Sequence, residues 1–405
     1  MIAVTSLADK EILLGVCGGI AAYKACDWTR ALRREGAAVT VVMTEAATRF
    51  VAPLTFAALS GRRVCTSMFA AEEAEQIPHI SLARQADAVL IAPATAQTIA
   101  RLAHGLADDL LSTLVLATTA KVVICPAMNS QMYRHPATQA NLAKLREYGY
   151  TVVEPACGTM ACGEEGPGRL VEWEEAHQAL LAALSRQDLA GLEVLVTAGP
   201  TWEPLDPARL LTNRATGRMG YAVAAAARQR GAKVTLISGP SELAAPWGVE
   251  VVRITTAMEM HREVMARAKK MAVIVKAAAV ADFRPKITAS SKTKKEKAAL
   301  TLALAANPDI LKELGAMKKK APRFPLLVGF AAESENLSAE AQRKLRDKNL
   351  DLIVANDITA TDAGFAATTN RVILIDRNGN EQELPLLSKE ETAHRLWDAA
   401  LALPH

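Results

Sequence analysis

The second half of the chain contains no cysteine. All six cysteines lie within the first 162 of the 405 residues, at positions 17, 26, 65, 125, 157 and 162. Six thiols in a chain of this length do not suggest a disulfide framework, which is typical of small secreted domains. We therefore expect most of these cysteines to be small, buried hydrophobic residues.

Three other features are absent. No apolar run is long enough to cross a membrane. The first residues, MIAVTSLADKEILLGV, have neither the basic head nor the small-residue cleavage site of a signal peptide. These two absences predict a cytoplasmic protein without membrane contact. The motif GxGxxG is missing as well, which disfavours an NAD-dependent oxidoreductase.

The length, hydrophobicity and charge of the chain limit its class. Half of the residues are hydrophobic, and 405 residues are too many for one ordinary core, so we expect two well-packed domains. Residues 1–190 carry 16 lysines and arginines against 19 acidic residues, whereas residues 191–405 carry 31 against 24. The basic second half suggests an anionic ligand, such as a nucleotide, a phosphate ester or a nucleic acid.

Hydrophobic patterning predicts two successive α/β series. Residues 11–44 suggest a short apolar strand, a glycine turn, an amphipathic helix and a second strand, and further buried strands follow at 86–95 and 121–129. The pattern restarts at 192–201, and its later strands include residues 271–283. We predict two Rossmann-like, doubly wound α/β domains, 1–190 and 191–405.

Small and hydroxyl-bearing residues follow three strands of the first domain. Gly18 and Gly19 occupy a strand-to-helix turn where backbone N–H groups can approach a phosphate, although a tight-packing turn is an equal alternative. Thr44 and Thr95 follow two more strands. Because open parallel sheets bind ligands at this edge, three converging turns favour a binding site.

Four other residues are candidates with open alternatives. His79 is a base or a surface histidine. Asn129 is able to hold a carboxylate, or it caps a helix. Cys157 and Cys162 lack the second close ligand pair of a structural zinc site, so a metal is disfavoured. Cys162 is then either an acid or an inert loop cysteine.

Four motifs in order give the first domain a family resemblance: GVCGGIAAYK, the segment 78–114, PAMNSQMY and ACGEEGPGR. They resemble the flavin-dependent cysteine decarboxylases, and the phosphopantothenoylcysteine decarboxylases in particular. The resemblance implies FMN, which oxidises the substrate thiol to a thioaldehyde that loses carbon dioxide, and then returns a hydride. It implies that His79 is the base, that Asn129 binds the substrate carboxylate, and that Cys162 in a flexible clamp is the proton donor. Cys17, Gln97 and Tyr133 depart from the family pattern.

The second domain has polar residues in corresponding places. Thr216 and Gly217 lie at the predicted start of a helix, and Arg209, Asn213 and Arg214 precede them. This helix start is either an anion-binding site or an ordinary capped helix. Asp282 is expected at the carboxyl end of a buried strand. The run KTKK at 292–295 is a solvated basic loop or a phosphate contact, and Lys344 and Lys348 share a helix face. Lys276, a charge inside a strand, suggests an edge or interface position.

These segments, with EPLDPARLLTNRATGRMG, AAAVADFRP, NPDI, GFAAE and ANDI, resemble the bacterial, CTP-dependent phosphopantothenate–cysteine ligases. The resemblance implies attack of the phosphopantothenate carboxylate on CTP, and then displacement of CMP from the acyl-cytidylate by cysteine. It implies Mg²⁺ with the triphosphate and no confident protein metal ligand. Lys292 would also assist the second step, and Arg209 and Asn213 would hold the intermediate. Pro200 departs from the family's GGT. The implied CTP site consists of Asp282, Lys292, Asn307, Pro308, Asp309, Ile310, Phe330, Lys344 and Lys348.

Together the two resemblances imply an enzyme of coenzyme A biosynthesis in which a ligase makes the substrate of a decarboxylase. Its expected partners are 4′-phosphopantothenate, cysteine and CTP, without nucleic acid. The families also imply a homo-oligomer with trimeric decarboxylase and dimeric ligase contacts. The alternatives are a flavin-binding regulatory protein and a peptidyl-cysteine decarboxylase. Neither alternative would need the complete ligase half.

Overall fold

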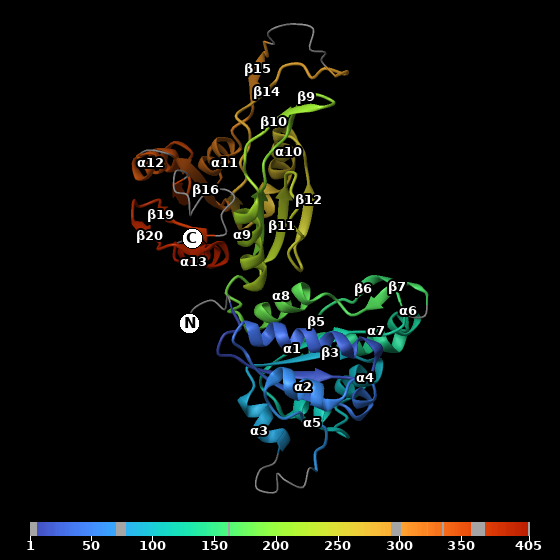
Figure 1. Cartoon of the computed structure of the whole chain (residues 1–405). Helices are drawn as coiled ribbons and strands as arrows, with labels where there is room; N and C mark the ends of the chain where they lie inside the picture. Colours follow the sequence, from blue (N-terminus) through green and yellow to red (C-terminus); the bar gives the residue numbers. More distant parts are fainter. Residues whose placement is uncertain are drawn as a thin grey trace. The chain divides into compact units, whose positions relative to one another are not determined.

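The computed structural model describes residues 6–69, 78–160, 163–292, 301–321, 323–333, 336–357 and 369–403. The chain forms two compact units, Met1–Arg186 and Gln187–His405. Each unit is a mainly parallel sheet with helices on both faces (Figure 1). The prediction of two doubly wound α/β domains is therefore confirmed.

The sheet of the first unit has five parallel strands in the order β2-β1-β3-β4-β5. Strand β2 lies on one side of β1, whereas β3, β4 and β5 follow on the other side, so the strand order reverses between β1 and β3. The carboxyl ends of the strands at such a reversal form the ligand edge of flavodoxin-like sheets. The strands are β1 (Glu11–Val16), β2 (Ala38–Met43), β3 (Ala88–Ala94), β4 (Lys121–Pro126) and β5 (Thr151–Val152).

Helices cover both faces of this sheet. On one face α1 packs against α8, with the ring centroids of Trp28 and Trp173 5.6 Å apart. On the other face α4, α5 and α7 enclose a core that includes Val89 and Leu114. The helices are α1 (Lys24–Arg34), α2 (Pro53–Ser60), α3 (Pro78–Gln85), α4 (Ala96–His104), α5 (Leu110–Ala117), α6 (Ser130–Arg134), α7 (Pro136–Glu147), α8 (Trp173–Leu184), and the 3-10 helices η1 (Ile20–Tyr23) and η2 (Glu45–Arg49).

The described parts of the glycine-rich segment 155–169 contain two short strands. They form an antiparallel hairpin of β6 (Ala156–Thr159) and β7 (Glu165–Arg169). Among the five described cysteines only Cys17 and Cys125 are buried, and Cys157 on β6 is exposed, so the expectation that most are buried is wrong. None of these five described cysteines is in a disulfide.

The sheet of the second unit has eight strands in the order β12-β11-β8-β13-β16-β17-β19-β20. The first six are parallel, and β19 and β20 add an antiparallel edge. The order reverses between β8 and β13, as in dinucleotide-binding folds. The strands are β8 (Glu193–Ala198), β11 (Lys233–Ser238), β12 (Glu250–Arg253), β13 (Val273–Lys276), β16 (Leu326–Glu333), β17 (Leu352–Asp357), β19 (Val372–Asp376) and β20 (Glu381–Glu383).

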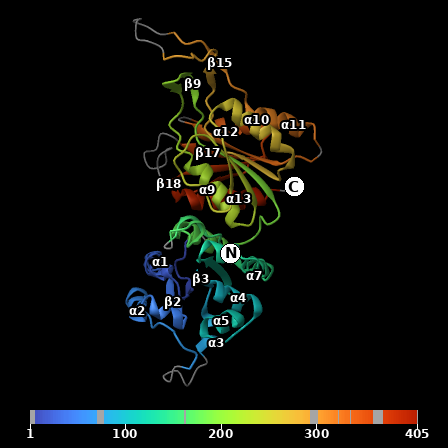
Figure 2. The same cartoon turned by 90° about the vertical axis from the view of Figure 1, so that its right-hand side faces the viewer.

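Successive residues of these strands enter different cores. Val194 and Val275 face α9 and α13, whereas Leu195 and Ile274 face α10, α11 and α12 (Figure 2). This alternation explains why the strands are apolar throughout, because both faces are covered. The helices are α9 (Arg218–Gln229), α10 (Ala257–Arg267), η4 (Ala268–Lys270), α11 (Ile310–Lys319), α12 (Leu337–Asp347) and α13 (Lys389–Leu401).

Short hairpins complete the second unit. The hairpin of β9 (Glu203–Asp206) and β10 (Arg209–Leu211) packs beside that of β14 (Phe283–Pro285) and β15 (Leu304–Ala306) (Figure 1). A third pair joins β18 (Thr369–Asn370) to β21 (Leu387–Ser388). The first two hairpins extend the loops that leave the ligand edge of the sheet.

Candidate active sites

A cavity of about 1080 Å³ lies at the carboxyl ends of β1, β2, β3 and β4 in the first unit. It spans the point between β1 and β3 where the strand order reverses, which is where doubly wound sheets bind ligands. Five residues predicted from the sequence line it together: Gly18, Gly19, Thr44, Thr95 and Asn129. The three turns that were expected to converge therefore do so.

The turn after β1 passes so close to the turn after β2 that residue 18 must lack a side chain. A Cβ atom on Gly18 would lie 2.4 Å from the Cβ of Ala46 and 2.8 Å from its carbonyl carbon. Gly19 has extended backbone and precedes η1 without a side-chain cap. Backbone N–H groups at this turn are thus available to an anionic ligand in the cavity.

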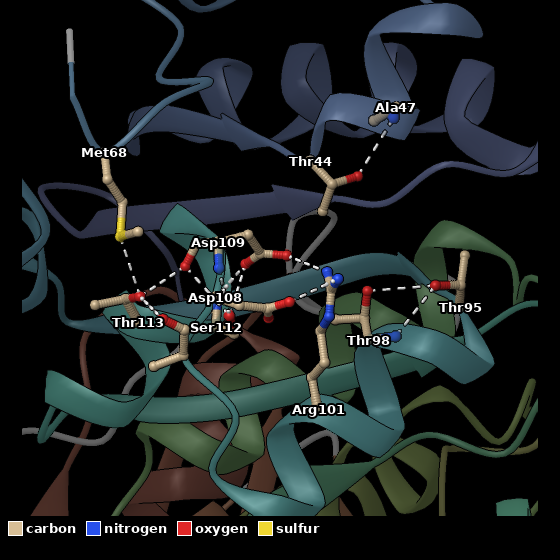
Figure 3. A network of polar contacts seen from close by, with 11 residues as sticks. Thr44, Ala47, Met68, Thr95, Thr98, Arg101, Asp108, Asp109, Ser112 and Thr113 are labelled. Atoms are coloured by element: carbon tan, nitrogen blue, oxygen red, sulfur yellow. Dashed lines mark hydrogen bonds and ion pairs between the residues drawn. The ribbon is translucent and has the colours of Figure 1, made fainter.

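Thr44 and Thr95 act first as helix caps. The hydroxyl of Thr44 accepts from the N–H of Ala47 at 3.3 Å, and that of Thr95 accepts from the N–H of Thr98 at 3.3 Å (Figure 3). Both threonines also line the cavity. Capping and ligand binding are therefore compatible roles for the same residues.

An ion-pair network that sequence reasoning missed also borders the cavity. Arg101 of α4 holds Asp109 at 2.7 Å and Asp108 at 3.0 Å, and all three residues line the cavity (Figure 3). Asp109 in turn caps α5, because its Oδ1 accepts from the N–H of Ser112 at 2.7 Å. The only available signal was the Asp-Asp pair directly before an apolar helix, which is typical of a capping site.

Asn129 caps α6 and faces the hairpin of β6 and β7. Its Oδ1 accepts from the N–H of Gln131 at 2.8 Å, and its Nδ2 donates to Oε2 of Glu164 at 2.8 Å. The hairpin is held by a bond from the N–H of Met128 to the carbonyl of Gly168 at 2.9 Å. A Cβ on Gly168 would lie 2.2 Å from the Met128 oxygen, so this approach requires glycine.

Two other predicted residues of the first unit are not brought to this cavity. His79 is the second residue of α3, which packs against α5, and it is not among the residues that line the cavity. Its Nδ1 is buried without a hydrogen-bond partner among the described residues. Cys162 lies outside the described residues.

The departures from the family pattern have structural consequences. Cys17 is buried beneath the turn after β1, and its side chain is hydrogen-bonded to that of Thr98. Burial raises the pKa of its thiol to about 11. Gln97 lines the cavity. Tyr133 is buried, its hydroxyl donates to Glu154, and burial raises its pKa to about 12. Cys17 is thus a neutral neighbour of the site and does not line the cavity.

The second unit has a smaller cavity of about 160 Å³ at the carboxyl ends of β8, β13 and β16. It lies where the strand order reverses, and Phe330 is the one predicted CTP residue among the described residues that line it. Helix α9 begins here at Arg218, with Gly217 as its N-cap at φ +85°. A helix N-terminus favours an anion, in agreement with the prediction for Thr216 and Gly217, which also line the cavity.

The segment before α9 is tied to the segment after β13. Oδ1 of Asn213 accepts from the N–H of Ala215 at 3.0 Å, and Nδ2 donates to the carbonyl of Ala279, which lines the cavity. Arg209 lies on the exposed strand β10, where its Nη1 is 3.3 Å from the buried carboxylate of Asp206. Asn213 therefore lies close to the cavity, whereas Arg209 lies on the hairpin of β9 and β10.

Asp282 does not end a strand, and this prediction is wrong. Strand β13 stops at Lys276, and Asp282 is exposed at the start of β14. Beyond Lys276 the regular pairing with β8 is interrupted where the hydroxyl of Thr197 accepts from the N–H of Ala278 at 3.2 Å, and it resumes as an isolated bridge between Pro200 and Ala279. The residues between are mainly alanines, which have low β propensity.

Asn307 fixes the loop that carries Asp282. Its N–H donates to the Asp282 carbonyl at 2.8 Å, and its Nδ2 donates to the Ala281 carbonyl at 2.8 Å. Asp309 follows, caps α11, and accepts from Lys348 at 2.9 Å. Burial opposes ionisation of Asp309, but its pKa is lowered by the bonds from Lys348 and the α11 backbone.

Lys276 is not at an edge, as the sequence suggested, but in the central strand β13 between β8 and β16. It is the last residue of that strand and is 9% exposed. Burial, reinforced by the charge of Lys348, lowers its pKa to about 8, and Asp309 and Asp282 oppose that shift. A titratable lysine therefore lies at the ligand edge of the second unit.

The remaining predicted CTP residues are spread along the same edge. Ile310 is 2% exposed, so only its backbone can reach a ligand, and Pro308 precedes the α11 cap. Lys292 is exposed in the described part of its loop. Lys344 is half-buried on α12, and Lys348 is the C-cap of that helix.

Several polar residues that line the second cavity were not predicted. Asn370 is 3% exposed, and its Oδ1 has no hydrogen-bond partner among the described residues. Lys389 is 5% exposed, and burial together with the nearby Arg218 lowers its pKa. Asn356, the next-to-last residue of β17, lines the cavity with them. The sequence offered ANDI as a signal for Asn356 but none for Asn370, which reaches the cavity only through the fold.

Among the described residues, no group of three or more histidines, cysteines, aspartates or glutamates is arranged to hold a metal ion. No described helix is long and apolar enough to span a membrane.

The fold defines a two-domain α/β protein with a cavity at the strand reversal of each unit. Family models match both units: "Flavoprotein" over residues 2–185, and "DNA/pantothenate metabolism flavoprotein C-terminal domain" over residues 189–403.

Curated relatives match almost the whole chain. The Bacillus subtilis "Coenzyme A biosynthesis bifunctional protein CoaBC" is 46% identical over 98% of each chain. The proteins of the same name from Vibrio cholerae and Escherichia coli are 47% and 45% identical, over 96% and 97% of this chain and 97% of theirs. A crystal structure described as the C-terminal domain of such a protein is 39% identical over 52% of this chain and 94% of its own, with a TM-score of 0.44.

The chain therefore belongs to the family of bifunctional coenzyme A biosynthesis proteins. The prediction of a coenzyme A biosynthesis enzyme that combines a decarboxylase with a ligase is confirmed.

Proposed function

We propose that residues 1–190 form an FMN-dependent phosphopantothenoylcysteine decarboxylase and that residues 191–405 form a CTP-dependent phosphopantothenate–cysteine ligase. The observation that carries this proposal is the presence of a cavity at the strand reversal of each unit, in a chain of this family. The second unit makes the amide that the first unit decarboxylates. The net result is 4′-phosphopantetheine.

The residues of the first cavity fit FMN. Its volume of about 1080 Å³ suits a cofactor with its substrate, and the close approach at Gly18 leaves backbone donors uncovered for a phosphate. Gly19, Thr44 and Thr95 complete the proposed FMN contacts. When bound, FMN supplies the oxidation of the substrate thiol and the later return of a hydride.

The chain's own groups orient the substrate and move protons. Because Oδ1 of Asn129 caps α6, its Nδ2 faces away from that helix. This N–H donor is suited to bind the substrate carboxylate. Cys162 would give a proton in the final reduction. His79 would act as the base that accepts the thiol proton.

His79 does not line the cavity of its own chain, and this supports the proposed homo-oligomer. In an assembly of several copies, His79 of one copy would complete the cavity of its neighbour. A trimer of first units with dimeric contacts between second units is the arrangement that we propose. The exposed apolar side chains Ile20 and Tyr23 at the cavity rim support burial of that rim against a second copy.

The second unit is suited to bind CTP along its ligand edge. Asn307 bonds to the backbone of Asp282, and Lys348 forms an ion pair with Asp309. Phe330 offers an apolar surface at the cavity. The proposed CTP contacts also include Lys292, Pro308, Ile310 and Lys344.

The acid substrate would bind next to the nucleotide. Arg209 and Asn213 would hold the acyl-cytidylate formed when the phosphopantothenate carboxylate attacks the α-phosphate of CTP. Lys292 would assist the attack of the cysteine amine, which displaces CMP. Mg²⁺ enters as the charge partner of the triphosphate.

A coupled assay tests the proposal. The purified protein should be yellow, with the spectrum of an oxidised flavin. Given 4′-phosphopantothenate, cysteine and CTP, it should release pyrophosphate, CMP and carbon dioxide in equal amounts. Release of pyrophosphate without carbon dioxide would leave only the ligase assignment standing. Equal use of ATP and CTP would overturn the nucleotide assignment.

A further inference from the structure

The side-chain amide of Asn129 has a fixed orientation. Its Oδ1 is engaged by the N–H of Gln131 at 2.8 Å, which caps α6. Its Nδ2 therefore points away from the helix, toward the hairpin of β6 and β7. There it donates to Oε2 of Glu164 at 2.8 Å. The donor that suits a substrate carboxylate already holds a carboxylate of the protein.

Backbone contacts place Glu164 over Asn129. The N–H of Met128 donates to the carbonyl of Gly168 at 2.9 Å, which fixes the hairpin beside Asn129. The N–H of Met160 donates to the carbonyl of Glu164 at 2.9 Å, which fixes the backbone of residue 164 across the hairpin. The side chain of Glu164 is exposed, so it can leave Asn129 without opening a core.

We propose that the Glu164 carboxylate competes with the substrate carboxylate for Nδ2 of Asn129 and thereby sets how weakly the decarboxylase site binds acids. This inference rests on the proposed decarboxylase function of the first unit. Nδ2 carries two N–H donors, so both carboxylates would have to bind side by side, and two carboxylates at one amide nitrogen repel each other. The substrate therefore binds at Asn129 more weakly while Glu164 keeps its bond.

The competition distinguishes substrate from product. The substrate carries the carboxylate, and it must displace Glu164. The product has lost that group as carbon dioxide, so it gains nothing at Asn129 and leaves Glu164 free to bond there again. Glu164 therefore weakens substrate binding, whereas it does not alter the affinity for 4′-phosphopantetheine.

A purely structural role for Glu164 makes the opposite prediction. If the bond to Asn129 serves to hold the hairpin over the cavity, its loss disturbs the binding of substrate and product alike. The neighbouring Glu165 provides a matched control, because it has the same charge and is exposed on β7.

The experiment compares the full chain with Glu164→Ala, Glu164→Gln and Glu165→Gln. For each, the KM for 4′-phosphopantothenoylcysteine and the inhibition constant of 4′-phosphopantetheine are measured from carbon dioxide release. Because a hydrogen bond to a charged group is lost, Glu164→Ala should lower the KM about tenfold. Glu164→Gln should lower it less, since a neutral amide oxygen still accepts from Asn129. The product constant should stay unchanged, and Glu165→Gln should change neither value.

The other outcomes are decisive as well. An unchanged KM in Glu164→Ala overturns the competition, as does a rise of both constants together, which a structural tether predicts. An equal fall of the KM in Glu165→Gln would attribute the effect to the loss of any negative charge near the site, and it would also overturn the competition. If the unaltered chain releases no carbon dioxide, the proposed decarboxylase fails, and this inference fails with it.

Discussion

Nη2 of Arg230 lies 2.6 Å from Oδ2 of Asp188, and this pair joins the end of α9 to the first residues of the second unit. Nη1 of the same guanidinium lies 2.9 Å from Oδ1 of Asp398 in α13. The Arg230 side chain is 1% exposed, so its charge is compensated almost entirely by these two carboxylates. Arg230 thus links helix α9 to helix α13.

Replacing Arg230 by Met should destabilise the second unit. The change leaves two partly buried carboxylates without their partner, and breaking a buried ion pair costs about 3–5 kcal/mol of unfolding free energy. Urea unfolding measures the loss. Lys233→Met is the matched control, because the Lys233 side chain is 77% exposed in its pair with Glu193, so its loss should change the unfolding free energy far less. Equal losses in the two variants would contradict the buried role of Arg230.

Lys276 should make the stability of the second unit depend on pH. Folding lowers its pKa from 10.5 to about 8, so the unfolded chain binds the proton more tightly between these values. The free-energy cost of burying the charged Lys276 is therefore fully present below pH 8 and disappears as the pH rises toward 10.5. Lys276→Met should raise the unfolding free energy by roughly 3 kcal/mol at pH 7.

The pH dependence of this gain is its decisive feature. Thermal unfolding from pH 7 to pH 10.5 should show the advantage of Lys276→Met shrinking to near zero. Lys312→Met, at an exposed position of α11, should show no such advantage. A gain that stays constant over this pH range would mean that packing, not charge, accounts for it.

Gly168 should be essential for the decarboxylase and dispensable for the ligase. An alanine Cβ would lie 2.2 Å from the carbonyl oxygen of Met128, at a φ of +147°, so the hairpin could no longer pack beside Asn129. We expect Gly168→Ala to lose carbon dioxide release and to keep CMP release. Gly61→Ala controls for backbone strain alone, because its Cβ would meet nothing within 4 Å at φ +68° and its cost is about 1 kcal/mol. A fully active Gly168→Ala enzyme would refute the fixed docking of the hairpin.

Much of the fold could be predicted because its signals are local. The apolar strands at 11–16 and 193–198, with glycine turns after them, are typical of buried parallel strands. The same turns led to Gly18, Thr44 and Thr95, since the carboxyl ends of parallel strands meet at one edge. That reasoning needs only strand order, not side-chain contacts.

The errors came from long-range contacts. The strand expected over 271–283 ends at Lys276, and the backbone of Ala278 bonds instead to the Thr197 side chain of the neighbouring strand β8. Lys276 seemed out of place for the same reason, since only the fold sets it beside Asp309 and Lys348. Asn370 reaches the second cavity from a short strand far along the chain, which no spacing rule predicts.

His79 and Asn129 should complement each other between copies of the chain. If His79 of one copy completes the site of its neighbour, His79→Asn and Asn129→Ala variants are each inactive as decarboxylases. Co-expressed chains of the two variants should form some complete sites and regain part of the carbon dioxide release. Mixtures that stay inactive, although they form mixed oligomers by mass, would place both residues in the same copy's site.

The most direct test of two reactions on one chain is a paired separation of function. CMP and carbon dioxide are measured with 4′-phosphopantothenate, cysteine and CTP for Asn129→Ala and Asn213→Ala. Asn129→Ala should release CMP at the normal rate but little carbon dioxide. Asn213→Ala should release little of either, yet should decarboxylate added 4′-phosphopantothenoylcysteine normally. Loss of both reactions with every substrate in both variants would contradict the assignment of one reaction to each unit.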